Sequence, residues 1–90
     1  MTREDILDFL KTDLQISVPE LDRYLASLIA TATELIRAEG IELTDSIADG
    51  ELIEMYAAYL YRQRKGDIKE MPRALRYALN NRLFTQKGGA

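Results

Sequence analysis

The 90-residue chain contains no cysteine, no histidine and no tryptophan. Without cysteine no disulfide can form, and without cysteine or histidine the usual ligands of zinc are missing. The same absences remove the Ser–His and Cys–His pairs of nucleophilic catalysis and the commonest general acid–base group. The sequence also lacks a glycine-rich phosphate-binding loop. We therefore expect a protein that is not an enzyme, takes no cofactor and has no small-molecule substrate.

Long hydrophobic runs are missing as well. No stretch approaches the roughly 20 apolar residues that span a bilayer, and the first five residues, MTRED, are acidic rather than basic, unlike a signal peptide. We expect no membrane association. Ninety residues are the length of a single domain. The composition near the end of the chain predicts a flexible C-terminal tail over residues 85–90.

The charges are distributed unevenly along the chain. Residues 1–61 carry 13 acidic and 4 basic side chains, a net charge of −9, whereas residues 62–90 carry 2 acidic and 8 basic ones, a net charge of +6. A molecule with an acidic part and a basic part can attract its own copies head to tail, or direct the basic part to an acidic partner. The alternative interpretation is a chance placement of charges on solvated faces.

Helical periodicity and capping residues predict an all-α bundle of four main helices, with room for a short fifth and no sheet. The first helix is expected over residues 3–12, with a capping box formed by Thr2 and Asp5. The second is expected to begin near Pro19, with Ser17 as its N-cap, and to stop at Gly40. Its hydrophobic residues recur at spacings of three and four: Leu21, Tyr24, Leu25, Leu28, Ile29, Ala32, Leu35 and Ile36.

The third helix is expected to run from Ser46 or Asp49 to Lys65. Acidic residues lie in its early turns and basic ones in its last turn, which complements the helix dipole. Residues 55–61, MYAAYLY, carry no charge, so the helix is hydrophobic on nearly all sides and needs cover on nearly all sides. We interpret it as the central helix, with part of its surface facing a partner. Complete burial within one copy is the alternative.

The fourth helix is expected to open at Met71 and Pro72 and to turn its leucines inward. A second face, within about 100° of arc, gathers arginine, asparagine and aromatic residues, and arginine and aromatic residues are enriched at protein interfaces. We predict an oligomer or partner interface made by Arg73, Arg76, Tyr77, Asn80, Phe84 and Tyr61. A second group of cations is predicted to contact an acidic partner or channel DNA: Arg62, Arg64, Lys65 and Lys87.

A metal site has weak support in the sequence. Glu51 and Glu54 share a helix face, and Asp45 and Asp49 lie close by, so together they offer oxygens to a hard cation. Their spacing does not match the twelve-residue calcium loop. Acidic residues in the first turns of a helix are explained by the helix dipole alone, and we predict no metal site.

DNA binding is the alternative function. The fourth helix and its surroundings carry the basic and amide side chains that a recognition helix uses: Arg73, Arg76, Arg82, Lys87, Asn80 and Asn81. The isoelectric point of about 4.9 argues against a sequence-specific DNA-binding regulator, because DNA-binding domains are usually basic. Non-specific contact between the basic end and DNA phosphates stays open.

Residues 52–84 resemble the head–tail connector proteins of tailed bacteriophages, which are also called adaptor or head-completion proteins. The resemblance lies in the order and spacing of MYAAYLY at 55–61, MPRALRYALNN at 71–81 and the pair Leu83 and Phe84. The first half of the chain is similar in its general pattern, with an acidic first helix, an alanine-rich second helix beginning near PELD, and a stop at Gly40.

The resemblance implies a small helical bundle that assembles as a ring on the portal protein. It implies that the ring extends the DNA channel and docks the next neck, stopper or tail protein. The expected partners are therefore further copies of the chain, the portal and that next protein, with the isolated chain free to be monomeric. The expected location is the virion neck, and the host cytoplasm during assembly.

Overall fold

A computed structural model describes residues 1–89 of the chain, and within them it contains four α-helices and no strand, which confirms the predicted all-α class. The helices are α1 (Arg3–Asp13), α2 (Asp22–Ala38), α3 (Ile47–Arg64) and α4 (Arg73–Phe84). A short 3-10 turn, η1 (Pro19–Leu21), precedes α2, and a wide turn, η2 (Thr85–Gly89), follows α4.

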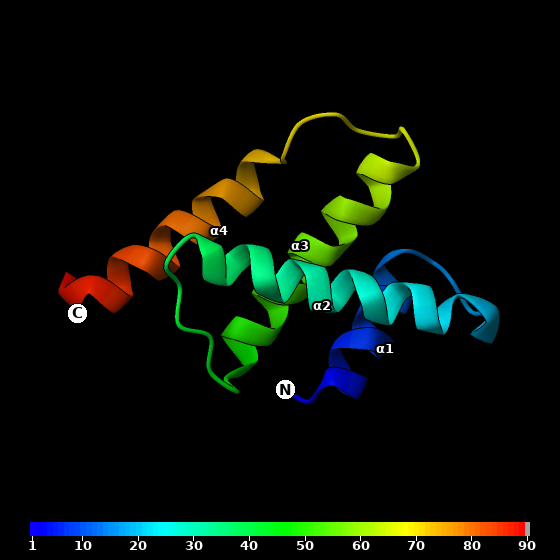
Figure 1. The fold of residues 1–90 in the computed structure, drawn as a ribbon, viewed down its shortest axis with the longest axis horizontal. Helices are drawn as coiled ribbons and strands as arrows, with labels where there is room; N and C mark the ends of the chain where they lie inside the picture. Colours follow the sequence, from blue (N-terminus) through cyan, green and yellow to red (C-terminus); the bar gives the residue numbers. More distant parts are fainter. Residues whose placement is uncertain (90) are drawn as a thin grey trace.

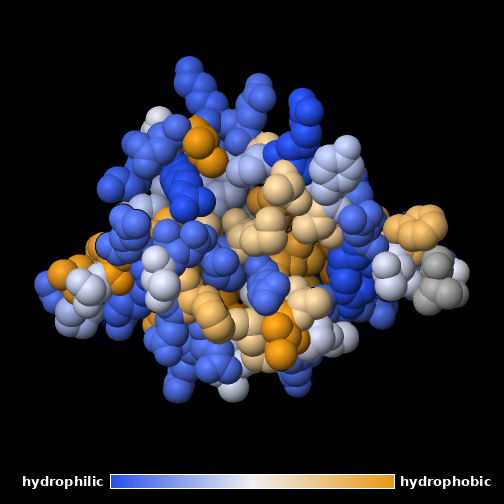
Figure 2. All heavy atoms as spheres, turned by 180° about the vertical axis from the view of Figure 1, so that it is seen from behind, coloured by the Kyte–Doolittle hydropathy of each residue, from blue (hydrophilic) through white to orange (hydrophobic). Residues whose placement is uncertain are grey.

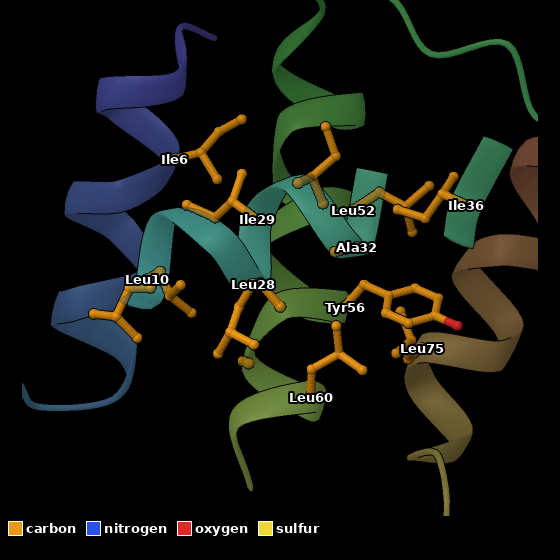
Figure 3. Packing of buried hydrophobic residues seen from close by; sticks show 14 of the residues in the cluster. Ile6, Leu10, Leu28, Ile29, Ala32, Ile36, Leu52, Tyr56, Leu60 and Leu75 are labelled. Atoms are coloured by element: carbon orange, nitrogen blue, oxygen red, sulfur yellow. The ribbon is translucent and has the colours of Figure 1, made fainter. Parts of the chain in front are cut away.

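α3 is the central helix, as the sequence predicts (Figure 1). α1 and α4 lie on opposite sides of α3, and α2 crosses one face of the layer that these three helices form (Figures 1 and 3). The shortest dimension of the molecule is 18 Å. Because packed helices lie about 8–10 Å apart, this dimension leaves room for two layers and no third. The other face of the layer, away from α2, is therefore not covered by a helix.

The core lies where α2 crosses the other three helices (Figure 3). Ile6 and Leu10 reach it from α1, and Leu75 and Leu79 reach it from α4. The remaining core side chains come mostly from the two long helices: Leu25, Leu28, Ile29, Ala32 and Ile36 of α2, and Leu52, Ile53, Tyr56, Ala57, Ala58 and Leu60 of α3. Burial of this apolar surface is the main favourable contribution to folding.

Two of the predicted helix starts have the expected N-cap hydrogen bonds, and one does not. The Thr2 hydroxyl accepts from the Asp5 amide and the Asp5 carboxylate accepts from the Thr2 amide, both at 3.1 Å, which confirms the capping box. The Ser46 hydroxyl accepts from the Asp49 amide at 3.1 Å. The prediction of Ser17 as an N-cap is wrong: the 3-10 turn puts Val18 at the cap position, where no side chain bonds the free amides.

The hydrophobic run of α3 is covered mainly within one copy of the chain. Tyr56, Ala57 and Leu60 are buried, because α1, α2 and α4 all pack on this helix. Tyr61 is half-buried and lies against Tyr24 of α2, with ring centroids 6.4 Å apart. One copy therefore supplies most of the cover that we expected a partner to share. The part of α3 that stays open is the side away from α2.

The predicted flexible tail, residues 85–90, is fastened to the body at its beginning. The Gln86 side chain accepts from the Glu42 amide at 2.6 Å and donates to the Gly40 carbonyl at 2.7 Å. These bonds tie η2 to the connection between α2 and α3. Ala90 lies outside the described residues.

Candidate protein-binding site

The outward side of α4 is an exposed face with two large aromatic side chains. Leu75 and Leu79 point into the core, and the opposite side of the helix carries Arg73, Tyr77, Asn80 and Phe84, all exposed or partly exposed. Tyr77 is 64% exposed and Phe84 is 68% exposed. The structure thus brings four of the six predicted interface residues together, and we call them the α4 face. Clusters of exposed aromatic and arginine side chains are typical of protein-binding surfaces.

The other two predicted interface residues have contacts inside the chain. Arg76 lies at the edge of the α4 face, where its guanidinium donates to both carboxylate oxygens of Glu39 at 2.9 and 3.2 Å. This bidentate pair joins α4 to the end of α2. Tyr61 packs on Tyr24, and the ammonium of Lys65 lies 5.4 Å from the centre of the Tyr61 ring. Arg76 and Tyr61 therefore each have a partner within the described part of the chain, unlike the four residues of the α4 face.

The structure does not bring the four predicted contact cations together on one surface. Arg62, Arg64 and Lys65 lie at the end of α3, and Lys87 follows α4 at the far end of the molecule (Figure 1). α4 lies between the two groups in the chain. At a rise of about 1.5 Å per residue, its length places Lys87 well over a helical turn away from the three cations of α3. Arg62 also lies 3.7 Å from Asp13 of α1. These cations form two separate groups rather than one basic face.

A buried ion pair joins the start of α3 to the end of α4. Asp49 is 1% exposed, and its carboxylate accepts from the Arg82 guanidinium at 2.7 and 3.1 Å. The Thr44 amide and hydroxyl donate to the same carboxylate at 2.7 and 2.8 Å. Burial alone would raise the pKa of Asp49, but the hydrogen bonds from Arg82 and Thr44 hold it below its usual range. Arg82 is thus a structural residue and not a free DNA contact.

The side of α3 that faces away from α2 is grooved. One groove of about 360 Å³ lies between α1 and α3, and two of about 230 and 210 Å³ lie between α3 and α4. Residues of α1, α3, α4 and the chain next to them line these grooves, and no residue of α2 does. Met55 lies in all three. Figure 2, which shows the molecule from behind, has hydrophobic residues gathered near the middle of this side and hydrophilic residues around them.

Two carboxyl groups meet in the groove between α1 and α3. Burial, and after it the hydrogen bond and the charge of the neighbouring Asp13, raise the pKa of Glu54 to about 8. The Glu54 oxygen Oε2 is buried without a hydrogen-bond partner among the described residues. With its pKa raised to about 8, the Glu54 carboxyl is mainly protonated at neutral pH. The groove therefore has an acidic side and an apolar side made by Phe9 and Met55.

Two of the four acidic residues considered as cation ligands have other surroundings. Asp49 belongs to the ion pair with Arg82, and the carboxyl group of Glu54 is partly buried beside Asp13, which raises its pKa. Within residues 1–89, no group of three or more potential ligands lies close enough to hold a metal ion. The described part of the chain also has no helix with both the length and the hydrophobicity needed to cross a membrane.

Comparisons of the chain with protein-family models, with curated proteins and with solved structures find no match. What the chain does must therefore be inferred from its own residues.

Sequence periodicity missed the polar connection between α3 and α4. Asp49 and Arg82 lie 33 residues apart, and no local pattern links them. One signal was available: two helices joined by a short loop run antiparallel, which brings the start of the first to the end of the second. An acidic residue at the start of α3 and a basic residue at the end of α4 fit that arrangement.

Proposed function

We propose that this chain is a structural protein of a tailed bacteriophage or prophage, a head–tail connector that assembles as a ring on the portal protein. In this role it extends the DNA channel and docks the next neck, stopper or tail protein. It acts in the virion neck, after assembly in the host cytoplasm, and it performs no catalysis. The family resemblance of residues 52–84 supplies the viral context.

The observation that carries the proposal is the α4 face. Tyr77 and Phe84 expose about two-thirds of their surface on a helix whose other side is well packed by Leu75 and Leu79. Exposing two large aromatic side chains on one face is costly in water and typical of surfaces that bind another protein. A chain without histidine or cysteine is suited to such a role.

The ion pairs of α4 count against the alternative of a DNA-binding regulator. Of the basic residues that such a helix would offer, Arg76 pairs with Glu39 and Arg82 pairs with Asp49. These pairs remove two of the cations that would contact bases or phosphates. A gel-shift titration discriminates: tight sequence-specific binding at physiological salt would support the regulator and contradict the connector.

Complementation of a gene deletion tests the connector directly. In the phage or prophage that encodes the chain, deletion is expected to leave DNA-filled or DNA-losing heads without tails, and the wild-type gene restores infectious particles. The double variant Tyr77→Ala/Phe84→Ala is expected to lower the yield about tenfold or more, because interface aromatics of this kind contribute about 2 kcal/mol each.

The matched control is Ile47→Ala, which removes an equally exposed apolar side chain (68%) outside α4. It should leave the yield unchanged. Normal particle yield from the deletion strain would overturn the proposal. Normal yield from a folded Tyr77→Ala/Phe84→Ala variant would overturn the assignment to the α4 face.

A further inference from the structure

The outward row of α3 and the α4 face have the same spacing. Along α4, Arg73, Tyr77, Asn80 and Phe84 follow one another at steps of four, three and four residues, the pattern of a helix that lies in a groove. Along the side of α3 that faces away from α2, four of the residues that line the grooves follow at the same steps: Glu51, Met55, Ala58 and Arg62. Each row spans about 16 Å.

Placed side by side in parallel, the two rows are chemically complementary at each step. Arg73 lies opposite Glu51, which gives an ion pair, and Tyr77 lies opposite Met55, which gives a sulfur–aromatic contact. Asn80 lies over Ala58, a small residue that is 2% exposed and recessed between the neighbouring helices. Phe84 lies opposite Arg62, which gives a cation–π contact.

The wider charges agree with this pairing. Residues 71–90 contain no aspartate or glutamate, so the α4 face carries positive charge only. In the groove beside the α3 row, Glu51 supplies the unpaired negative charge, because Asp13 lies 3.7 Å from Arg62 and the raised pKa of Glu54 keeps that carboxyl mainly protonated at neutral pH. Glu51 and Arg73 are both exposed, and neither makes an ion pair among the described residues. Each is left with an unmatched charge for a partner to neutralise.

We propose that the α4 face of one copy packs in parallel along the Glu51–Met55–Ala58–Arg62 row of the next copy. The contact is between copies because α4 packs on its own chain through the buried Leu75 and Leu79, and the α4 face lies on the opposite side of that helix. The inference rests on the proposed function, since a ring needs two different complementary surfaces on each subunit. It supplies both.

A single helix in a groove buries less surface than the roughly 1,200–2,000 Å² of a stable interface. The free chain therefore associates weakly, and copies held beside one another on a larger partner bind far better through the gain in effective concentration. A test on the isolated chain accordingly uses millimolar protein and a covalent trap.

Disulfide trapping tests the register, because the chain has no cysteine of its own. Chains with one introduced cysteine are mixed in pairs, so every disulfide joins two molecules. Met55→Cys with Tyr77→Cys and Arg62→Cys with Phe84→Cys should cross-link, since facing residues bring their Cα atoms within about 7 Å. Met55→Cys with Phe84→Cys, two turns out of register, should not. Glu34→Cys on α2, which has a 75% exposed side chain, paired with Tyr77→Cys gives the background.

A charge exchange tests the same contact without cysteine. Arg73→Glu and Glu51→Arg should each weaken self-association about fivefold by sedimentation, as expected for one ion pair at an interface. The double variant Arg73→Glu/Glu51→Arg restores the pair at every interface and should restore association. Thermal melting by circular dichroism confirms that each variant is folded.

Two results would overturn this contact: cross-linking at or below background for both in-register pairs, or a folded double variant that associates no better than the single variants. These outcomes are separate from failure of the connector proposal. In-register cross-links from a chain that fails to complement a phage would leave the contact in place and remove the connector. Complementation without in-register cross-links would leave the connector proposal in place and remove the contact.

Discussion

At the scale of single residues, the pair formed by Asp49 and Arg82 is the clearest case of a side chain whose role only the fold reveals. Asp49 is buried at the start of α3, and both oxygens of its carboxylate are hydrogen-bonded. Arg82 also donates to the Glu42 carbonyl at 2.7 Å, so one guanidinium fixes α4 to both α3 and the preceding connection.

Removing Arg82 leaves a buried carboxylate without its counter-charge. We expect Arg82→Ala to lower the free energy of unfolding by about 3 kcal/mol, the usual cost of breaking a buried pair on one side. Urea denaturation followed by circular dichroism measures this change. Arg64→Ala, which removes an exposed arginine of α3, is the control and should change stability by less than about 0.5 kcal/mol. Equal effects of the two substitutions would contradict the role given to Arg82.

Gln15 carries local backbone strain at the end of α1. Its φ of 58° lies in the left-handed region, where the Cβ atom makes the conformation unfavourable. The turn is needed because the Ile16 amide donates back to the Lys11 carbonyl at 2.8 Å. We expect Gln15→Gly to raise the free energy of unfolding by about 0.5–1 kcal/mol, whereas Gln15→Ala, which keeps a Cβ, should give no such gain. A melting curve in which alanine stabilises as much as glycine would count against strain as the cause.

At the scale of elements, the junction of α1 and α3 has a pH dependence. Glu54 faces Asp13, Arg62 and Glu51, and burial together with Asp13 raises its pKa from 4.5 to about 8. Between these two values the folded chain holds a proton that the unfolded chain releases. The stabilising contribution of the protonated carboxyl is therefore complete below about pH 4.5 and is lost as the pH rises through 8.

Glu54→Gln removes that loss, because the amide stays neutral at every pH. At pH 8 we expect the free energy of unfolding of the variant to be about 1 kcal/mol higher than that of the wild type, after allowance for solvent screening at a partly open site. At pH 4.5 the two proteins should be closely similar. Glu51→Gln, at the exposed rim of the same groove, serves as the control. A difference that does not vary with pH would rule out titration of Glu54 as its source.

How far the sequence predicts the fold differs between kinds of element. Hydrophobic periodicity and caps predict the four helices, the stop at Gly40 and the central place of α3, because these depend on residues a few positions apart. The start of α2 differs from expectation because Pro19 favours a short 3-10 turn over direct capping by Ser17. Which side of α3 stays open depends on where α2 crosses it, and no local pattern contains that information.

The candidate site was predictable in part, because a shared helix face depends only on residues a few positions apart. The spacing along α4 predicts that Arg73, Tyr77, Asn80 and Phe84 share a face, and the structure shows it exposed. The sequence could not show that Arg76 and Tyr61 differ from these four residues. Their partners, Glu39 and Tyr24, belong to α2 and to its C-terminal end, and no local pattern predicts those contacts.

At the scale of the whole molecule, part of the charge division of the sequence is used inside the chain. Three ion pairs join a cation of residues 62–90 to an acidic residue of the first part: Arg62 with Asp13, Arg76 with Glu39, and Arg82 with Asp49. The attraction between the two parts therefore helps to hold α4 and the end of α3 in place. The other five cations of residues 62–90 make no ion pair among the described residues, and Arg73 on the α4 face is one of them. On the acidic side, Glu51 beside Met55 is likewise unpaired.

The most direct test of the connector proposal is native mass spectrometry of the chain mixed with the portal complex from the same genome. We expect a portal ring that gains a full set of copies, and a folded Tyr77→Ala/Phe84→Ala variant that adds few or none, while Ile47→Ala adds as many as the wild type. A portal complex whose mass is unchanged by an excess of the folded wild-type chain would contradict the proposal.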